Sequence, residues 1–365
     1  MGLFDSLRRD KKVVPTVEPE RKESTSETQS GDAGERADKS APTTNQGADK
    51  VAPTGDERAD KSAPTGERKS EVDVALEAEV IERDTSIPDV PKEEPPRIKS
   101  YKDKKPVTHA IGTTKIMAII NQKGGVGKST TAINLSAALG ELGKQILLVD
   151  LDPQGNTTSG LGIEKNQLNG CIYDVLLNDV PIEEVIIPDI CEGLDLVPAT
   201  INLAGAEVEL VSEMARENRL KDAVGVMRGK YDYIFIDCPP SLGLLTVNSL
   251  VAADKLIIPI QTEFYALEGV TKLLESMKRV KNRLNPSLDI FGILLTMYDG
   301  RTTLSRQVAR EVRDYFGPLV FETIIPRTVK LSEAPSYGIP ITQYDPLGKG
   351  AKSYQELAKE VIQRG

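Results

Sequence analysis

The segment KIMAIINQKGGVGKSTTAINLSAALGEL constrains the fold of this chain more than any other. An apolar run leads into a glycine-rich loop, and the loop opens a stretch with helical periodicity, which is the context that a phosphate-binding loop requires. Gly124, Gly125 and Gly127 allow the backbone to bend so that its N–H groups converge on phosphate oxygens, and the helix N-terminus adds the positive end of its dipole. The segment therefore predicts a nucleotide phosphate site rather than a glycine-rich turn without a ligand.

This loop contains two lysines, although a phosphate loop ordinarily needs one. Lys128 is expected to reach the β and γ phosphates, and the Ser129 hydroxyl to ligate Mg²⁺. The usual pattern G-x-x-x-x-G-K-[ST] begins with a glycine, but Gln122 occupies that position and Lys123 follows it. From the residues alone, Lys123 could contact phosphates of its own subunit or lie in solvent.

Apolar runs and helical periods alternate after Thr114. The expected strands are 116–120, 145–149, 194–197, 233–236, 256–260, 291–296 and 321–325, and the expected helices include 129–142, 204–227, 266–284, 304–315 and 351–363. Short, continuously apolar strands separated by helices indicate an α/β fold with a mostly parallel, twisted sheet flanked by helices. A ligand is then expected at the loops that follow the carboxyl ends of the strands.

Three aspartates stand at such carboxyl ends. QILLVD runs into LDPQGN, which places Asp150 and Asp152 two residues apart, and YIFID ends at Asp237. A single aspartate that closes a strand is often only a turn former. Three of them beside a phosphate loop favour carboxylates that hold Mg²⁺ and position water.

The N-terminal third has a different composition. It is rich in Pro, Ser, Thr, Glu, Lys and Asp, and its aromatic residues are Phe4 and Tyr101. ADKSAPT, ADKVAPT and ADKSAPT begin at Ala37, Ala48 and Ala59, and the proline in each copy blocks a continuous helix. We expect residues 1–112 to be a disordered, low-complexity extension and residues 113–365 to form the folded domain.

Two short segments of this extension could contact a partner. EVDVALEAEVIER, residues 71–83, could form one acidic helix that docks a partner, although the pattern favours a transient helix in a linker. MGLFDSLRR could form one amphipathic turn that touches a membrane or a factor at the cell pole.

Composition narrows the chemistry. Three cysteines without a CxxC pair favour neither a disulfide framework nor a zinc site, and they fit a reduced, cytoplasmic protein. The single histidine, His109, lies in the polar linker, which argues against a histidine base in the folded part. No apolar run approaches the ~18 residues of a membrane span. The net charge of −9 leaves room for a local basic patch.

Several motifs together resemble one family. KGGVGKST resembles the deviant Walker A loop of the MinD and ParA group of P-loop NTPases. LDPQGNTTSGLGI, VPATINLAGAEVEL, DCPPSLGLLTVNSL, YALEGV and IPRTVKLSEAPSYGIPI resemble the Soj/ParA chromosome-partition ATPases. This resemblance covers roughly Lys115 to the end. The departures are Ser129 in place of threonine and Lys330 where the family often has arginine.

The resemblance implies roles for individual residues. Lys123 would cross a dimer interface to the partner's nucleotide, and Asp152 matches the switch aspartate needed for hydrolysis. Asp237 looks like the Walker B aspartate that holds Mg²⁺. The implied ATP-binding set is Lys123, Gly124, Gly125, Val126, Gly127, Lys128, Ser129, Thr130, Pro326 and Thr328, with the last pair at the adenine; the implied metal set is Ser129, Asp152 and Asp237.

A partition ATPase must hold DNA without reading its sequence, which requires lysines and arginines that contact phosphates. By resemblance, Arg301 and Lys330 match the family's basic DNA-contacting positions. Arg306 and Arg327 are further candidates in the same segments. A run of four basic residues between 278 and 283 is an alternative, although a charged helix face is usually only solvated; it consists of Lys278, Arg279, Lys281 and Arg283.

The resemblance implies an ATPase that forms a homodimer with ATP and Mg²⁺, binds nonspecific double-stranded DNA at the nucleoid, and is stimulated by a ParB-type centromere-binding protein. The main alternative is a MinD-like or pole-positioning ATPase that acts at a membrane through its N-terminus. A scaffold without ATP turnover is a third possibility. An iron-protein relative is disfavoured because Cys238 offers no cluster pattern. The extension also lacks the apolar periodicity of an N-terminal DNA-reading helix pair.

Overall fold

The computed structural model describes residues 112–264, 266 and 268–365. The extension up to residue 111, with its repeats, its acidic segment, its amphipathic start and His109, lies outside the described residues. The interpretations of these segments, and the boundary between extension and domain, therefore stay predictions.

An eight-stranded sheet forms the centre of the described part. Its strands are β1 (Lys115–Ile119), β2 (Ile146–Asp150), β3 (Ile187–Cys191), β4 (Leu194–Val197), β5 (Tyr233–Asp237), β6 (Lys255–Gln261), β7 (Asp289–Tyr298) and β8 (Val320–Pro326). They lie in the order β3-β4-β2-β5-β1-β6-β7-β8, and each neighbouring pair is parallel except β3 with β4. The predicted α/β class with a mostly parallel sheet is confirmed.

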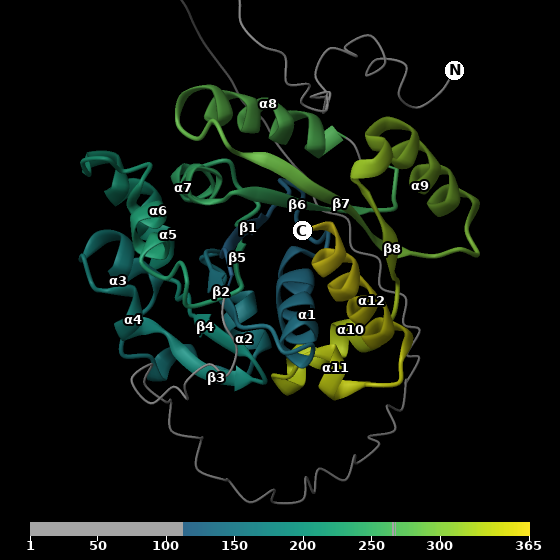
Figure 1. The fold of residues 1–365 in the computed structure, drawn as a ribbon, viewed down its shortest axis with the longest axis horizontal. Helices are drawn as coiled ribbons and strands as arrows, with labels where there is room; N and C mark the ends of the chain where they lie inside the picture. The colour runs from purple at the N-terminus through teal and green to yellow at the C-terminus, as the bar shows by residue number, and fades with distance from the viewer. Residues whose placement is uncertain (1–111, 265, 267) are drawn as a thin grey trace, which may run out of the picture. The chain divides into compact units, whose positions relative to one another are not determined.

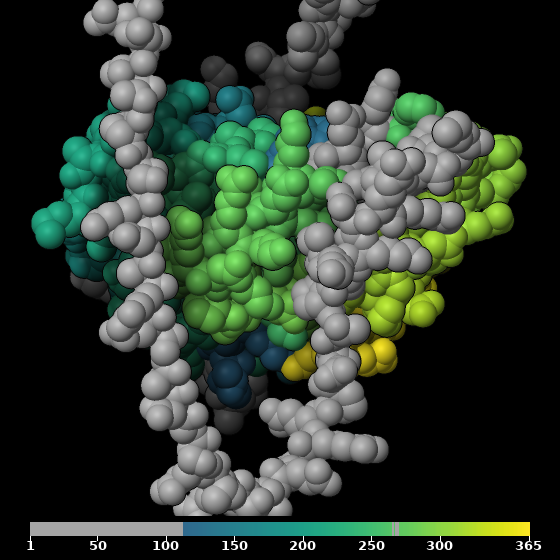
Figure 2. Space-filling view, turned by 90° about the horizontal axis from the view of Figure 1, so that it is seen from above, coloured from purple at the N-terminus to yellow at the C-terminus, as the bar shows by residue number. Residues whose placement is uncertain are grey.

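Helices cover both faces of this sheet, and Figure 1 shows α7, α8 and α9 on one side and α1, α10, α11 and α12 on the other. The helices are α1 (Lys128–Glu141), α2 (Asn156–Gly160), α3 (Ile172–Leu177), α4 (Ile182–Val185), α5 (Leu203–Glu209), α6 (Arg219–Gly225), α7 (Leu244–Ala252), α8 (Glu268–Arg283), α9 (Thr303–Phe316), α10 (Lys330–Glu333), α11 (Ile341–Tyr344) and α12 (Lys349–Arg364). Figure 2 looks onto the first side, where the green atoms of α8 lie between teal segments and the yellow-green α9. Among these described helices, none has the length and apolar content needed to cross a membrane.

Continuous apolar strands explain why the sheet is buried on both faces. In β1, β2 and β5 nearly every side chain is buried, including Ile119, Leu148 and Phe235 at 0% exposure. Burying one such side chain contributes about 1.5–3 kcal/mol. The helix α12 adds a stripe of buried side chains spaced three and four residues apart, among them Tyr354 and Val361. It packs against α1 and β8.

Two details differ from the sequence-based expectation. The helix expected over 204–227 is wrong as a single element, because α5 ends at Glu209, a 3₁₀ turn covers Leu210–Ser212, and the backbone becomes extended at Glu213 before α6 begins. Ala215 then adopts a positive φ of 51°, which no helix interior allows. Side chains distant in sequence hold this break, since Asn248 Nδ2 donates to the Arg216 carbonyl.

The second difference is the strand β3, which was not among the expected strands. It is a short edge strand with Pro188 in its interior, and Asp189 has a positive φ of 56°. Its pairing with β4 is antiparallel and irregular in register. Proline is tolerated at such an edge because one side of the strand has no hydrogen-bonding neighbour.

The sheet register brings the predicted site together. Asp237 at the end of β5 lies opposite Asp150 on β2 and opposite Ile119 on β1. The chain leaves β1 at this edge and enters the glycine-rich loop before α1. The phosphate loop and the aspartates therefore share the carboxyl edge of the sheet, where ligands bind in parallel α/β folds.

Candidate nucleotide and magnesium site

The glycine-rich loop adopts the conformation that its glycines permit. Gly125 and Gly127 have φ values of 73° and 89°, which residues other than glycine rarely adopt. Lys128 is the first residue of α1, and it is only 7% exposed. Asn121 holds the start of the loop, because its Nδ2 donates to the Pro259 carbonyl at 2.7 Å and its Oδ1 accepts from the backbone N–H of Lys123 at 3.0 Å.

One side-chain bond ties the loop to the seventh strand. Thr296 Oγ1 donates to the carbonyl oxygen of Val126 at 2.8 Å, and both residues are buried. The next residue, Met297, has a positive φ of 51°, so the strand departs from regular geometry directly beyond this contact. Neither residue was predicted to act in the site. Asn121 lies just before the glycines of the phosphate loop, where no role was assigned to it, and Thr296 lies in a predicted strand far along the chain.

The Asp237 carboxylate is arranged to accept one more partner. Its Oδ2 accepts a 2.7 Å hydrogen bond from the Thr157 hydroxyl. Its Oδ1 is buried and has no hydrogen-bond partner of ordinary length among the described residues. Burial raises the pKa of Asp237 to about 6, although the hydroxyls of Ser129 and Thr157 and the charge of Lys128 act against this rise.

These features fit a magnesium ion. Mg²⁺ is bound by one or two protein oxygens and completes its shell with water and phosphate oxygens. The open Oδ1 of Asp237 and the Ser129 hydroxyl beside it are oxygens of the right type. A divalent cation would also offset the cost of burying this carboxylate.

The other two aspartates differ in what they can do. Asp150 is fully buried and saturated, because its Oδ2 accepts from both the backbone N–H and the hydroxyl of Thr158, at 2.8 and 2.7 Å, and its Oδ1 accepts from the Asp152 N–H at 3.2 Å. Burial and the neighbouring Asp237 raise the pKa of Asp150 to about 7. These contacts make Asp150 a support for the loop that carries Asp152.

Asp152 itself lies close enough to influence Asp237 electrostatically, and it is 6% exposed. Its Oδ1 accepts from the Gln154 N–H at 3.0 Å, and its carbonyl accepts from the Gly155 N–H at 2.7 Å. This turn fixes the carboxylate beside the phosphate loop. The structure thus brings together Lys128, Ser129, Asp152 and Asp237, and their individual roles stay predictions.

The second lysine of the loop contacts a carboxylate in this structure. Lys123 Nζ lies 3.9 Å from Glu263 Oε2, on the loop after β6. The other oxygen of the same carboxylate, Oε1, lies 3.6 Å from a guanidinium nitrogen of Arg327. Glu263 was not identified from the sequence, since an isolated glutamate in a loop carries no signal of its own.

The predicted DNA-contacting residues lie on the loops after β7 and β8 and in the first turns of the helices that follow them. Arg301 follows β7, its side chain is 90% exposed, and it pairs with Asp299 at 2.8 Å. Arg306 donates to the Gly300 carbonyl at 2.7 Å. Lys330 at the start of α10 pairs with Glu333 at 2.8 Å. Hydrogen bonds from Arg301 lower the pKa of Asp299, and the charge of Arg327, on the loop after β8, adds to this effect. The two loops are therefore close enough to interact electrostatically.

The remaining candidates for DNA and adenine contacts have no described contact with the phosphate loop. Lys278 and Arg279 are exposed on α8, which is compatible with a solvated face. Pro326 ends β8 opposite Tyr298, and Thr328 Oγ1 accepts from the Lys330 N–H at 3.3 Å. Nothing in the described contacts joins Pro326 or Thr328 to the phosphate loop, and their assignment to the adenine stays a prediction.

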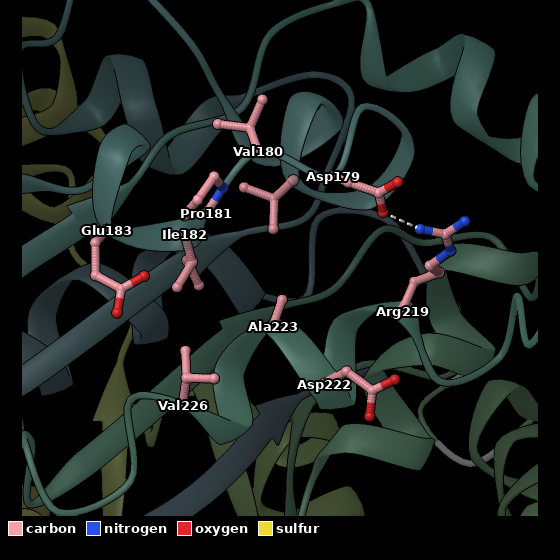
Figure 3. A pocket seen from close by; sticks show the side chains of 10 residues that line it. Asp179, Val180, Pro181, Ile182, Glu183, Arg219, Asp222, Ala223 and Val226 are labelled. Carbon is pink, nitrogen blue, oxygen red and sulfur yellow. Dashed lines mark hydrogen bonds and ion pairs between the residues drawn. The ribbon is translucent and has the colours of Figure 1, made fainter.

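A pocket of about 370 Å³ lies elsewhere, between the α3–α4 connection and α6. Apolar side chains such as Ile182 and Val226 line it, and Arg219 pairs with Asp179 at its edge (Figure 3). None of its lining residues comes from the phosphate loop. Arg219 also pairs with Glu213, so this arginine holds the break between α5 and α6 in place.

Comparisons with known proteins agree with the geometry of the phosphate site. The model of a family described as an AAA domain matches residues 114–290. The chain is 56% identical to the sporulation initiation inhibitor protein Soj of Bacillus subtilis over 251 residues, which cover 69% of this chain and 99% of that protein. It is 55% identical to the chromosome partitioning protein ParA of Myxococcus xanthus, with 68% of this chain and 88% of that protein covered.

Solved structures show the same fold. A structure titled cobyrinic acid a,c-diamide synthase from Mycobacterium smegmatis, with bound ATP analogue and magnesium, is 41% identical with a TM-score of 0.61, and the match covers 68% of this chain and 95% of that one. The septum site-determining protein MinD of Pyrococcus horikoshii, complexed with Mg-ADP, is 28% identical with a TM-score of 0.56, over 68% of this chain and 96% of that one. Taken with the phosphate loop and its aspartates, the partition relatives, which match over nearly their whole length, show that this chain belongs to the Soj/ParA family of partition ATPases.

Proposed function

We propose that this protein is a Mg²⁺-dependent ATPase that partitions DNA, switching between a monomer and an ATP-bound dimer. The observation that carries the ATPase assignment is the buried, open Oδ1 of Asp237 beside Lys128 and Ser129. The ATP analogue with magnesium in one structural neighbour and Mg-ADP in another support ATP and Mg²⁺ as the cofactors.

Each residue of the site contributes to positioning and charge neutralisation, which supply most of the catalysis in phosphoryl transfer. Lys128 and the N–H groups of the loop bind phosphate oxygens, while Ser129 and Asp237 hold the metal. Asp152 orients the attacking water and holds its proton. When bound, Mg²⁺ neutralises charge on the phosphates. No histidine is required for these steps.

Dimerisation would complete the site. Lys123 is one-third exposed, and its only described ion pair is with Glu263 over 3.9 Å, so little holds it in place. In the proposed dimer it reaches the phosphates bound by the other subunit. The dimer then joins two sets of basic residues. In each subunit DNA phosphates are contacted, without reading of the sequence, by Arg301, Arg306, Arg327 and Lys330.

We further propose that a ParB-type centromere-binding protein triggers hydrolysis and that the protein acts in the cytoplasm at the nucleoid. A partition role is supported by the relatives named for chromosome partitioning. The chain is 55% identical to ParA of Myxococcus xanthus but only 28% identical to MinD of Pyrococcus horikoshii. The competing proposal is a pole-positioning or membrane role carried by the N-terminal segment.

The test compares DNA binding with ATP and with ADP. Fluorescence anisotropy with a nonspecific duplex should show tight binding with Mg·ATP, weak binding with ADP, and an affinity that falls steeply with salt. Equal binding with both nucleotides and at all salt concentrations would rule out the switch. Deleting residues 2–9 distinguishes the two proposals. If the deletion abolishes localisation to the pole or membrane but leaves DNA binding intact, the pole or membrane role is supported.

A further inference from the structure

Glu263 connects two cations to which the proposed function gives separate tasks. Its Oε2 lies 3.9 Å from Lys123 of the phosphate loop, and its Oε1 lies 3.6 Å from Arg327 of the DNA-facing loops. The two cations use different oxygens, so one carboxylate can hold both at once. All three side chains are between one-third and two-thirds exposed, with values of 33%, 43% and 67% for Lys123, Glu263 and Arg327.

The loop that carries Glu263 is hydrogen-bonded to the turn from Asp299 to Ser305, which carries the predicted DNA-contacting residue Arg301. Thr262, the preceding residue, shares a 2.7 Å hydrogen bond with the Ser305 hydroxyl at the start of α9. Ser305 Oγ accepts from the Asp299 N–H at 3.1 Å, and Asp299 binds Arg301. The Arg327 N–H donates to the Tyr298 carbonyl at 3.0 Å, which joins the loop after β8 to the same turn. These bonds hold the residue before Glu263 against the turn that carries Asp299 and Arg301.

We propose that Glu263 is a shared counter-ion that restrains both steps of the switch. This inference rests on the proposed function, in which Lys123 moves to the partner's nucleotide and Arg327 moves to a DNA phosphate. Each move replaces one carboxylate contact by a phosphate contact. Glu263 therefore competes with phosphate for both cations. In the free monomer it keeps Lys123 from engaging and masks Arg327.

The expected effect of removing the Glu263 charge is small because Lys123, Glu263 and Arg327 are all partly exposed to solvent. Ion pairs between exposed side chains are weak, so removing the Glu263 charge should strengthen each phosphate contact by about two- to fivefold rather than by orders of magnitude. The gain should shrink as salt increases, because the Debye length falls from ~30 Å at 0.01 M to ~8 Å at 0.15 M. A contribution of this size suits a restraint that a partner or DNA must be able to overcome.

The variant Glu263→Gln tests the proposal, with two matched controls. Glu333→Gln removes a carboxylate that pairs with Lys330 but with neither Lys123 nor Arg327. Glu322→Gln removes an exposed charge near the start of β8, at the opposite end of that strand from Arg327. Dimerisation is measured by sedimentation without DNA, in the presence of Mg²⁺ and a non-hydrolysable ATP analogue, and DNA binding by anisotropy of a nonspecific duplex.

We expect Glu263→Gln to tighten dimerisation and DNA binding each about two- to fivefold at low salt. Glu333→Gln should tighten DNA binding alone, and Glu322→Gln should change neither. In a Lys123→Ala background Glu263→Gln should no longer affect dimerisation. In an Arg327→Ala background it should no longer affect DNA binding by protein that the ATP analogue has already made dimeric. A purely structural role for Glu263 would not disappear selectively in this way.

The outcomes separate this proposal from the proposed function. If the wild type does not dimerise with the ATP analogue or does not bind DNA, the proposed function itself is wrong. If the wild type does both, but Glu263→Gln behaves like either control or weakens both steps in a folded protein, the shared counter-ion is wrong. Circular dichroism and thermal unfolding of each variant establish that it is folded.

Discussion

Thr296 Oγ1 donates a hydrogen bond to the carbonyl oxygen of Val126, so β7 supports the phosphate loop from the side. Because both groups are buried, Thr296→Val leaves the Val126 carbonyl without its partner. We expect a loss of about 1–3 kcal/mol in the free energy of unfolding and a severalfold weaker affinity for an ATP analogue. Urea unfolding and an equilibrium titration with the analogue measure the two effects.

Thr342→Val is the matched control for this prediction. The Thr342 hydroxyl is buried and has no hydrogen-bond partner among the described residues, so the same substitution there should leave stability unchanged or raise it slightly. Equal losses for the two variants would show that the Thr296 bond does not support the loop.

Variants at two charged residues of the proposed site, Asp152 and Lys123, should lose different steps. Asp152→Ala removes the group that orients water but leaves Lys128 and Asp237 to bind the metal and phosphates, so we expect an ATP-dependent dimer on DNA that does not hydrolyse ATP. Lys123→Ala should lose hydrolysis and also weaken the dimer. Phosphate release assays and sedimentation with ATP distinguish the two. Asp152→Ala with wild-type turnover would contradict its assignment.

Much of this site could be predicted from the sequence because its parts are local. The glycines, Lys128 and Ser129 lie in one continuous segment, and Asp152 and Asp237 mark strand ends that continuous apolar runs identify. The break in the helix expected over 204–227 could not be predicted, because bonds from Arg219 and Asn248 to distant groups hold it. Glu263 was missed for a similar reason, since its partners come from the first and last thirds of the folded part.

Arg301 should contribute to DNA binding through charge alone. Its side chain is almost fully exposed, and the pKa of its partner Asp299, held at about 2 by hydrogen bonds from Arg301, keeps that carboxylate ionised at any working pH. Arg301→Ala should weaken binding of every duplex sequence alike and reduce the slope of log affinity against log salt by about one. Anisotropy titrations across a range of salt concentrations give both quantities.

Two further variants make this prediction specific. Lys359→Ala, at an exposed position toward the end of α12, removes a charge on the side of the chain's C-terminus, which lies beside the start of β1, and should leave the slope unchanged. Lys278→Ala with Arg279→Ala tests the alternative surface on α8. A loss confined to the α8 variant would move the DNA-binding surface to that helix.

The last helix should show a pH-dependent contribution to stability through Glu360. Burial alone would raise the pKa of this carboxyl, but the N–H groups of Thr323 and Glu322 and the guanidinium of Arg364 lower it below its ordinary value. A depressed pKa means that the unfolded chain binds the proton more readily, so the stabilisation is present above the unfolded pKa and is lost as the pH falls through the folded one. Glu360→Gln should therefore cost about 1–3 kcal/mol at neutral pH and progressively less below the ordinary glutamate pKa of about 4.3. Urea unfolding of both proteins at about pH 7, 5 and 4 measures this difference above and below the ordinary glutamate pKa.

The carboxylate joins α12 to the edge strand β8. A difference in stability that stays constant across this pH range would therefore mean that packing of the helix, rather than the charge of Glu360, holds α12 on the sheet.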